Sequence, residues 1–473
     1  MRNTWRVLLA CAAVVALGVG TVAWAQQRTG AETAARTGSP LARLPIRRER
    51  LDNGLRLVLS PDPTIPTIAI AVYYDVGSRN EQRGRSGFAH LFEHMMFEGS
   101  ENVDKGEHFA LVMNRGGSLN GTTNHDRTNY FETLPSNELA LGLWLEADRM
   151  RSLAVTEENF ENQRQIVMEE WRQSYGNQPY ALSSLRINEL AYGDFWPYSH
   201  STIGDMADLQ NAPLADVQDF FRSYYPPNNA VLSISGDFDP DQAIELAQRH
   251  FGGIASRQVP AYEPAALAPQ TSERTDTMLD PLAERPGFHI AWHIPPARER
   301  DHYALEMMAL ILGDGESSRL YQELVKQREL CQEIFVGTDD RRGPDLFSVW
   351  AIVAGGHTGA EVRPFIFRQI ESVARRGVTA RELEKARNRV RSYFVFGLSS
   401  NLQRAQRLAE YELYWGNAEL IRAELDNYLA VTDADIRRVA SQYFAQTNRT
   451  VLDVVPPPPE PAAAQPAAEG GAQ

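Results

Sequence analysis

Residues 87–97 read GFAHLFEHMMF, and the interpretation of the whole chain starts from this stretch. It contains the spacing His-x-x-Glu-His, formed by His90, Glu93 and His94, in a context compatible with a helix. Residues three and four apart share one face of an α-helix, so the two histidines point the same way, one turn apart. Two imidazoles at that separation can bind one Zn²⁺ ion, with a carboxylate beside them to take a proton from water. Two buried core histidines would be the simpler interpretation if the motif stood alone.

A zinc site in a hydrolase needs a third protein ligand and an open fourth position. Residues 160–174 have a helical pattern and contain the adjacent pair Glu169 and Glu170. A carboxylate from this pair would complete a set of two histidines and one glutamate. The residues alone favour neither of the two, and a solvent-exposed acidic helix face is the commoner explanation of such a pair.

Composition excludes several classes of protein. The chain has 473 residues, which corresponds to about two to three domains. Its 43% hydrophobic and 23% charged residues are typical of a globular protein. A net charge of −14 repels phosphate backbones, so no nucleic-acid partner is expected. Two cysteines cannot form a disulfide framework.

The first residues have the features of an export signal. Two arginines precede the apolar stretch 7–22, and Ala-Trp-Ala at 23–25 is a small-x-small cleavage site. The apolar run is shorter than the ~20 residues that span a bilayer, which favours cleavage over a retained anchor. Lipidation at Cys11 is disfavoured because almost no apolar segment precedes that cysteine. We therefore expect a signal peptide at 1–25, a flexible lead-in at 26–41, and an exported mature protein with no stable membrane span. Its compartment would be the periplasm if the source is Gram-negative.

The rest of the chain divides into two halves that resemble each other. Residues 224–234 and 443–454 each run from an amphipathic helix through a polar turn into a β-branched strand. Strand-like segments and helical patterns recur in both halves, which predicts an α+β duplication. Expected strands include 55–59, 68–74, 128–134 and 287–293, and expected helices include 139–151 and 380–396. We expect domains at 42–255 and 287–455, a linker at 256–286 and a disordered tail at 456–473.

The zinc motif and its surroundings resemble the pitrilysin/insulinase family of inverzincin metallopeptidases, which includes the mitochondrial processing peptidases. In that family the third zinc ligand is a glutamate about 76 residues after the second histidine, which implies Glu170. The family helix often reads Glu-Arg, five residues, then the ligand, and Gln163-Arg164 here supports Glu170 over Glu169. The family often has a glutamate at the position of Gln163 that assists catalysis. This departure affects the tuning of the expected site and not its existence.

Three further segments match the family. Gly116–Thr123 resembles Gly-Gly-x-x-Asn-Ala-x-Thr, whose asparagine contacts the substrate backbone. This implies substrate binding by Asn120, with Gly121 in place of the alanine, although the segment also fits a plain glycine-rich turn before a strand. Residues 126–130 extend the match, and residues 313–321 contain the family's Ser-Ser-Arg-Leu block.

The resemblance covers about residues 45–455 and implies both a fold and a mechanism. The implied fold has two homologous domains, each a mostly antiparallel sheet packed with helices, which together form half of a clamshell. His90, His94 and Glu170 would hold one Zn²⁺ per chain, and Glu93 would act as the general base of a metalloendopeptidase. The peptide substrate would bind extended, as an added strand at a sheet edge of the first half.

Self-sufficient members of the family carry an Arg and a Tyr, seven apart, after the Ser-Ser-Arg-Leu block. Those positions read Val325 and Gln332 here, and neither side chain can replace the pair. In heterodimeric members a homologous partner without zinc ligands supplies the Arg-Tyr pair, and the two subunits enclose a chamber for unfolded peptides. We expect this chain to be the zinc-bearing subunit of such a pair. The alternatives are a non-catalytic scaffold and a zinc- or peptide-binding protein with little turnover.

Four other histidines are interpreted without a metal. His108 and His125 are near the motif in sequence but are expected at the surface. His289 and His293 fall in strand-like sequence, where residues four apart lie about 13 Å from each other, too far to share one ion.

Overall fold

The computed structural model describes residues 40–262 and 266–458. The chain divides into two compact units, Met1–Leu44 and Pro45–Gln473, and both sheets belong to the second. The described part of the first unit contains a short 3₁₀ helix at Pro40–Arg43. The predicted signal peptide, and most of the predicted lead-in and tail, lie outside the described residues.

The first half of the chain forms a six-stranded sheet in the order β1-β2-β6-β3-β5-β4. β2 and β6 pair in parallel, and every other neighbouring pair is antiparallel. β3 and β6 are buried along almost their whole length, and β3 therefore reads as a nearly continuous apolar run. The strands are β1 (Arg47–Arg50), β2 (Arg56–Pro61), β3 (Thr67–Tyr74), β4 (Ser118–Thr123), β5 (Thr128–Pro135) and β6 (Ala230–Gly236).

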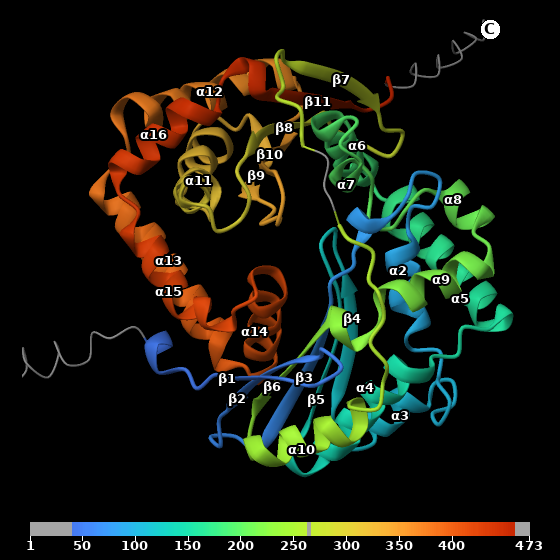
Figure 1. Cartoon of the computed structure of the whole chain (residues 1–473). Coiled ribbons are helices and arrows are strands. Elements are labelled where there is room, and N and C mark those ends of the chain that lie inside the picture. The colour runs from blue at the N-terminus through green and yellow to red at the C-terminus, as the bar shows by residue number, and fades with distance from the viewer. Residues whose placement is uncertain (1–39, 263–265, 459–473) are drawn as a thin grey trace, which may run out of the picture. The chain divides into compact units, whose positions relative to one another are not determined.

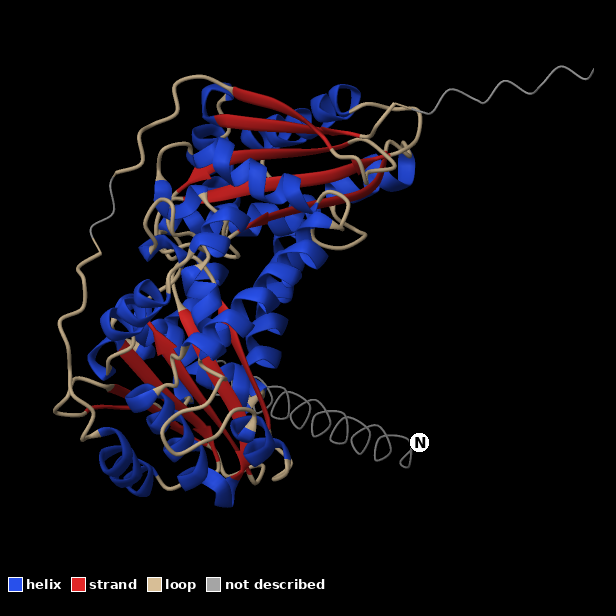
Figure 2. Ribbon diagram, turned by 90° about the vertical axis from the view of Figure 1, so that its right-hand side faces the viewer, coloured by secondary structure: helices blue, strands red, loops and turns tan. Residues whose placement is uncertain are grey.

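The second half repeats this plan in a five-stranded sheet (Figure 2), in the order β7-β11-β8-β10-β9. β7 and β11 pair in parallel and the other pairs are antiparallel. This is the order and direction of β2-β6-β3-β5-β4, so the predicted duplication of a mostly antiparallel α+β unit is confirmed. The strands are β7 (Arg274–Leu279), β8 (Gly287–Ile294), β9 (Cys331–Thr338), β10 (Asp345–Val353) and β11 (Arg449–Val455).

Helices connect and cover the strands in both halves (Figure 1). The helices expected at 139–151 and 380–396 are present as α4 and α13, each slightly longer than expected. The first half contains α2 (Phe88–Met95), α3 (Glu107–Met113), α4 (Leu139–Ser152), α5 (Glu157–Trp171), α6 (Ala181–Tyr192), α7 (Trp196–Ser199), α8 (Met206–Asn211), α9 (Leu214–Tyr224) and α10 (Pro240–Phe251). The second contains α11 (Arg300–Gly313), α12 (Gly359–Arg376), α13 (Ala380–Ser399), α14 (Asn401–Trp415), α15 (Ile421–Ala430) and α16 (Asp433–Tyr443).

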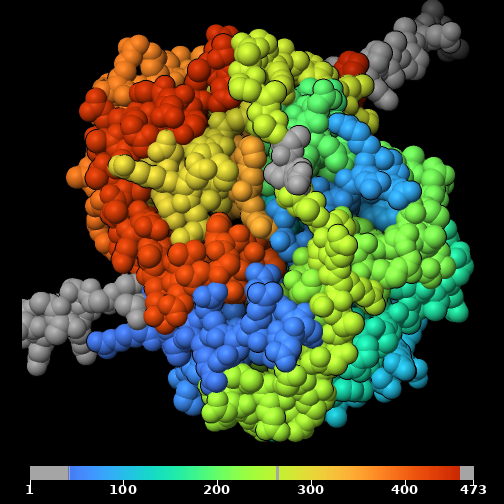
Figure 3. All heavy atoms as spheres, viewed as in Figure 1, coloured from blue at the N-terminus to red at the C-terminus, as the bar shows by residue number. Residues whose placement is uncertain are grey.

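Two helices pack against the sheet of the opposite half. α14 lies on β3 and β6 of the first sheet, and α6 lies on β8 and β11 of the second. The Arg404 guanidinium of α14 is 2.9 Å from the Asp62 carboxylate, and Glu412 pairs with Arg48 of β1 at 2.7 Å. In Figure 3 the blue atoms of the first strands accordingly lie against orange-red atoms of the second half. The exchange explains why β3 and β6 are covered on both faces.

β7 lies inside the stretch expected to be a linker. Its six residues, Arg-Thr-Asp-Thr-Met-Leu, alternate between half-buried and exposed positions, so they have little apolar character. The strand forms because β11 offers it a parallel partner. Residues 274–279 therefore belong to the second sheet, which local composition did not indicate.

The core behind α2 contains a buried polar cluster, which corrects one expectation. His108 is only 3% exposed. It begins α3 beside the Phe97 ring, and its Nε2 atom lies 3.5 Å from Oε2 of Glu132. Glu146 and Arg149 of α4 form a buried ion pair next to it. The predicted surface position of His108 is wrong because its partners come from α4 and β5, more than twenty residues away. His125 is half-buried, with its ring against Tyr198.

The Glu132 carboxylate gives the first testable prediction. Burial raises its pKa to about 7, while Arg149 opposes the shift. Between pH 4.5 and 7 the unfolded chain has lost this proton but the folded chain keeps it, so the stability of the fold decreases as pH rises through that window. Glu132→Gln, which imitates the protonated acid, should reduce the loss of unfolding free energy between pH 5 and pH 8 by up to about 3 kcal/mol.

Urea unfolding of wild type and variant at the two pH values measures the effect. Glu245→Gln, at an exposed residue of α10, serves as the control and should leave the pH dependence unchanged. An identical pH dependence of wild type and Glu132→Gln would contradict the assignment.

Candidate metal centre

Helix α2 presents the motif because its first turn is held by a buried carboxylate. Gly87 precedes the helix with a φ of 86°, and a Cβ there would lie 2.7 Å from the carbonyl oxygen of Ile203. Glu81 accepts hydrogen bonds from the backbone N–H groups of Gly87 and Ala89, at 2.9 and 2.7 Å. A negative charge at a helix N-terminus is favourable, so Glu81 stabilises the start of α2. His90 and His94 then lie one turn apart on the same face.

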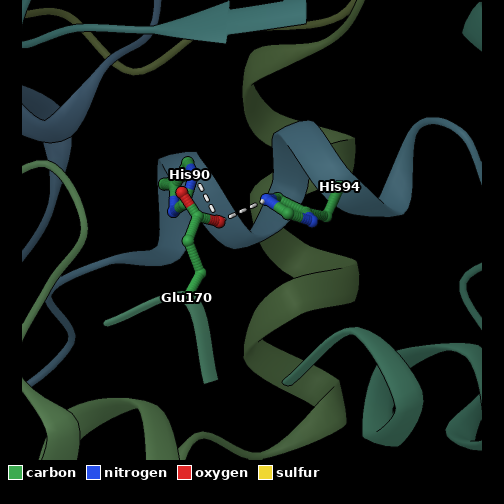
Figure 4. A group of neighbouring side chains, drawn as sticks. All are labelled: His90, His94 and Glu170. Carbon is green, nitrogen blue, oxygen red and sulfur yellow. Dashed lines mark ion pairs between the residues drawn. The ribbon is translucent and has the colours of Figure 1, made fainter. Parts of the chain in front are cut away.

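Helix α5 brings a carboxylate to this face. Thr156 caps its N-terminus by accepting a hydrogen bond from the Asn159 backbone N–H, and the helix packs against α2. Near its end, Oε2 of Glu170 lies 3.3 Å from Nε2 of His94 and 3.7 Å from Nε2 of His90 (Figure 4). The structure thus brings together the three residues for which the sequence suggested a ligand role.

The neighbouring glutamate faces away from the cluster. Glu169 accepts hydrogen bonds from Arg172 and Gln173 in the π-helical turn that follows α5, and its side chain is 54% exposed. It takes no part in the group of ligand atoms that includes the two histidines. The choice between the two glutamates, which the residues alone left open, is therefore decided in favour of Glu170 as the group that meets the imidazoles.

The donor set fits a zinc ion. Two imidazole nitrogens and one carboxylate oxygen lie within 4.8 Å of one another. Ligands about 2.0–2.1 Å from a tetrahedral Zn²⁺ would be about 3.3 Å apart, close to the separations found here. The side chains of His90 and His94 are 14% and 23% exposed and that of Glu170 is 40% exposed, so one side of the group is open to solvent.

The electrostatics of the group favour the forms that a metal requires at His90 and Glu170, but not at His94. Burial lowers the pKa of His90 to about 4, aided by His94 and opposed by Glu170. A hydrogen bond from His94 holds the pKa of Glu170 below its ordinary value. Burial also lowers the pKa of His94, but the bond and charge of Glu170 outweigh it and the pKa ends above its usual range. At neutral pH the carboxylate is ionised and the His90 imidazole is neutral.

Glu93 lies on α2 beside the cluster but is held by another element. Its Oε2 atom accepts a hydrogen bond of 2.6 Å from the Thr123 hydroxyl at the end of β4. Burial raises the pKa of Glu93, and the Thr123 bond opposes the shift. A Cβ on Gly121 would lie 3.1 Å from Cγ of Glu93, so the glycine that replaces the family's alanine loosens the packing against this carboxylate. Thr123 is a partner that sequence reasoning did not identify.

Asn120 lies on β4, the edge strand of the first sheet. Its side chain is exposed, and its Oδ1 atom accepts a hydrogen bond from the next backbone N–H, that of Gly121. Because Gly121 packs against Glu93, Asn120 is one residue from the wall of the candidate site. The edge of β4 beyond it has no partner strand among the described residues.

The two residues that stand where other family members have the Arg-Tyr pair belong to the second half. Val325 is half-buried in a π-helical turn at Tyr321–Gln327, and Gln332 is exposed on the edge strand β9. The preceding Ser-Ser-Arg-Leu block is anchored through Arg319, which forms a bidentate hydrogen-bonded pair with Glu382 of α13.

Two other groups of potential metal ligands occur among the described residues, but protein groups already engage them. In the cluster of His108, Glu132 and Glu146, the Arg149 guanidinium pairs with Glu146. In the group of His302, Glu306 and Asp340, Nε2 of His302 is 3.0 Å from Asp345, and Glu306 accepts a hydrogen bond from Tyr428. His289 and His293 of β8 belong to no such group.

The chain belongs to peptidase family M16, the insulinase family. Residues 56–195 match the family described as Insulinase (Peptidase family M16), and residues 211–390 match its Peptidase M16 inactive domain. Zinc protease PqqE of Helicobacter pylori is 31% identical, over 86% of this chain and 92% of its own length. An uncharacterized zinc protease of Mycobacterium tuberculosis strain H37Rv is 29% identical over the same shares. The resemblance stated from the sequence is thereby confirmed.

Solved structures agree in fold. The crystal structure of a protease from Helicobacter pylori has a TM-score of 0.83 and 29% identity, covering 87% of this chain and all of that one. The periplasmic protease PqqL from Escherichia coli has a TM-score of 0.71 at 16% identity, covering 87% of this chain and 47% of that one. At that identity the second likeness concerns the fold alone.

The two adjacent glutamates of α5 provide a matched pair for testing the third ligand. Glu170→Gln should weaken zinc binding by about 10²-fold or more, because a neutral amide is a much poorer ligand than a carboxylate. Glu169→Gln should leave the affinity unchanged, because this side chain faces solvent. Competition with a chromophoric chelator measures both dissociation constants. Equal affinities of the two variants would contradict the assignment of Glu170.

Proposed function

We propose that this chain is a zinc-dependent endopeptidase that cleaves unfolded peptides. The observation that carries the proposal is the meeting of two imidazoles and one carboxylate at an open site, with a second carboxylate on the same helix. The names of its relatives, which include several zinc proteases, support the same chemistry. In this proposal each chain holds one Zn²⁺ through His90, His94 and Glu170.

Each residue of the site would have a separate task. A zinc ion held by His90, His94 and Glu170 would lower the pKa of water from 15.7 toward about 7 and would polarise a peptide carbonyl. Glu93 takes the proton of the attacking water and later delivers it to the leaving amine, as a general base and then a general acid. The raised pKa of Glu93 favours both tasks, because proton transfer in either direction is most efficient when the pKa of the catalytic group is near the working pH. Thr123 keeps this carboxylate in place.

The substrate would bind as an extended strand along β4. An unpaired strand edge exposes backbone N–H and C=O groups that a peptide can pair with in any sequence. Asn120, at the exposed face of this strand, would contact the peptide backbone near the scissile bond. Only an unfolded or extended segment can add to a sheet in this way, which restricts the substrate class.

Glu93→Gln separates proton transfer from zinc binding. The amide keeps the size of the side chain but cannot accept a proton, so kcat should fall by about 10²- to 10⁴-fold. Zinc content should stay at one ion per chain. Hydrolysis of a mixed peptide pool and metal analysis of the same preparation measure the two properties. Full peptidase activity in this variant would show that another group is the base.

We further propose that the chain is the zinc-bearing subunit of a heterodimer. Val325 and Gln332 cannot supply the charged and phenolic donors that family members direct at the substrate carbonyl. A homologous partner chain would supply the missing Arg-Tyr pair, and the two subunits would enclose the chamber in which peptides are cut. Export, proposed from residues 1–25, would place the subunits in the periplasm if the source is Gram-negative. No helix in the described part of the chain is long and apolar enough to cross a membrane.

The missing pair gives a direct test of this arrangement. The chain alone should cleave peptides slowly, and addition of a homologous partner should raise the rate by at least about 10²-fold, the usual effect of one oxyanion donor. A chelator should abolish the activity of the mixture. The double variant Val325→Arg/Gln332→Tyr should gain activity without the partner if the chain also forms homodimers. Equal rates for the chain alone and the mixture would contradict the heterodimer.

The same missing pair favours one alternative, a zinc- or peptide-binding member of the family with little turnover. Such a protein would bind one zinc ion and peptides. It would not cleave the peptides, whether a partner chain is present or absent. A scaffold without catalysis is less well supported, because such a protein has no need to keep both histidines, Glu93 and Glu170 at one site.

A further inference from the structure

Glu98 lies at the junction of the two helices that carry the candidate ligands. It follows α2, four residues after His94, and is 8% exposed. Its backbone carbonyl oxygen accepts a hydrogen bond of 3.1 Å from the side-chain amide of Asn159. Its Oε1 atom accepts a second bond, of 2.7 Å, from Nε2 of Gln163. A single residue at the end of α2 therefore makes two hydrogen bonds with α5.

These contacts lie on the helix face that carries the third ligand. Intervals of four and seven residues return to the same side of an α-helix, so Asn159, Gln163 and Glu170 share one face of α5. Moving α5 along its axis by one residue, about 1.5 Å, would break both bonds to Glu98. The same movement would carry Glu170 away from the imidazoles. Glu98 thus holds α5 at the position where Glu170 meets α2.

Gln163 is the member of this face that bonds directly to the Glu98 side chain. Its NH₂ group donates to Glu98, which orients the amide with its nitrogen toward that carboxylate. Outer partners of this kind hold a metal ligand in position.

The charge of Glu98 is balanced from the other side. The ammonium group of Lys105 forms an ion pair with its Oε2 atom. The Lys105 side chain is 49% exposed, so water reaches the pair although the carboxylate is almost completely buried. The Glu98 carboxylate therefore meets a cation, Lys105, on one side and an amide donor, Gln163, on the other.

We propose that Glu98 is a positioning residue of the metal centre, and that it is the reason why residue 163 is glutamine in this chain. Glu98 orients the Gln163 amide and holds α5, and thereby the Glu170 carboxylate, in position beside the two imidazoles. The inference rests on the proposed function, because it assumes that zinc binds at His90, His94 and Glu170. A glutamate at position 163 would bring two carboxylates to within hydrogen-bond distance, and one of them could not remain ionised.

Two substitutions and their combination test the coupling. Gln163→Glu alone should weaken zinc binding by about tenfold or more, the usual effect of losing an outer-shell partner. Glu98→Gln/Gln163→Glu should restore the affinity to within about threefold of wild type. In the double variant the new amide at position 98 donates to the new carboxylate at position 163, which restores a hydrogen bond between the end of α2 and α5. Competition with a chromophoric chelator gives the zinc dissociation constants.

The visible absorption spectrum of the Co²⁺-substituted protein provides a readout that does not depend on turnover. The spectrum should change in Gln163→Glu and return toward wild type in the double variant, because it reports the ligand geometry. Glu101→Gln, an exposed carboxylate-to-amide change three residues beyond Glu98, should alter neither affinity nor spectrum. Circular dichroism of each metal-free variant monitors folding, and the isosteric changes avoid a cavity.

The possible outcomes separate this inference from the proposed function. If wild type bound no zinc, the proposed function would fail and this inference with it. If wild type bound zinc and Gln163→Glu bound it equally well, only the positioning role would be refuted. A weakened Gln163→Glu variant that Glu98→Gln did not rescue would also refute it, because the two residues would then act independently.

Discussion

The packing of α5 against α2 is the contact on which the candidate metal centre depends. α2 alone contributes two imidazoles, which is one ligand too few for a stable zinc site. The carboxylate of Glu170 arrives from a helix that begins more than sixty residues later in the chain. The position of α5 is determined by Asn159 and Gln163, which hydrogen bond to Glu98 at the end of α2. The position of the third candidate ligand therefore depends on the packing of α5 against α2 at Glu98.

The contact between α2 and α5 is supported by the sheet of the first half and by a helix of the second half. α2 and α5 lie over a sheet whose central strands are covered on the opposite face by α14, a helix of the second half. In the second half, α6 of the first half packs against β8 and β11. The ion pair between Arg404 and Asp62 links α14 to the first half. The two repeated units therefore share their cores. β4, which carries Asn120 and Thr123, remains at the edge of the first sheet, where its backbone can pair with a peptide.

Much of the fold could be predicted because the pattern of apolar residues along the chain follows the periods of helices and strands. The segments 68–74 and 287–293 are apolar and β-branched, and they form β3 and β8. Both halves end in the expected helix, turn and strand. The prediction did not extend to β7, whose polar sequence becomes a strand only through pairing with β11. It was wrong for His108, whose burial depends on Glu132 and α4, which are distant in sequence.

The sequence by itself determined the facing histidines, the adjacent Glu93, the repeated order of helices and strands, and membership of a zinc-peptidase family. The histidine face, the position of Glu93 and the order of elements follow from the fixed periods of helix and strand, which relate neighbours along the chain. The family membership follows from the zinc motif and the segments that match the family. Only the tertiary structure decided that Asn159 and Gln163 hydrogen bond to Glu98, and that α6 and α14 each pack against the sheet of the opposite half. It also shows that Glu170, which the family resemblance favoured, is the glutamate that meets the imidazoles. These depend on which surfaces of distant segments pack together, and no local period encodes that choice.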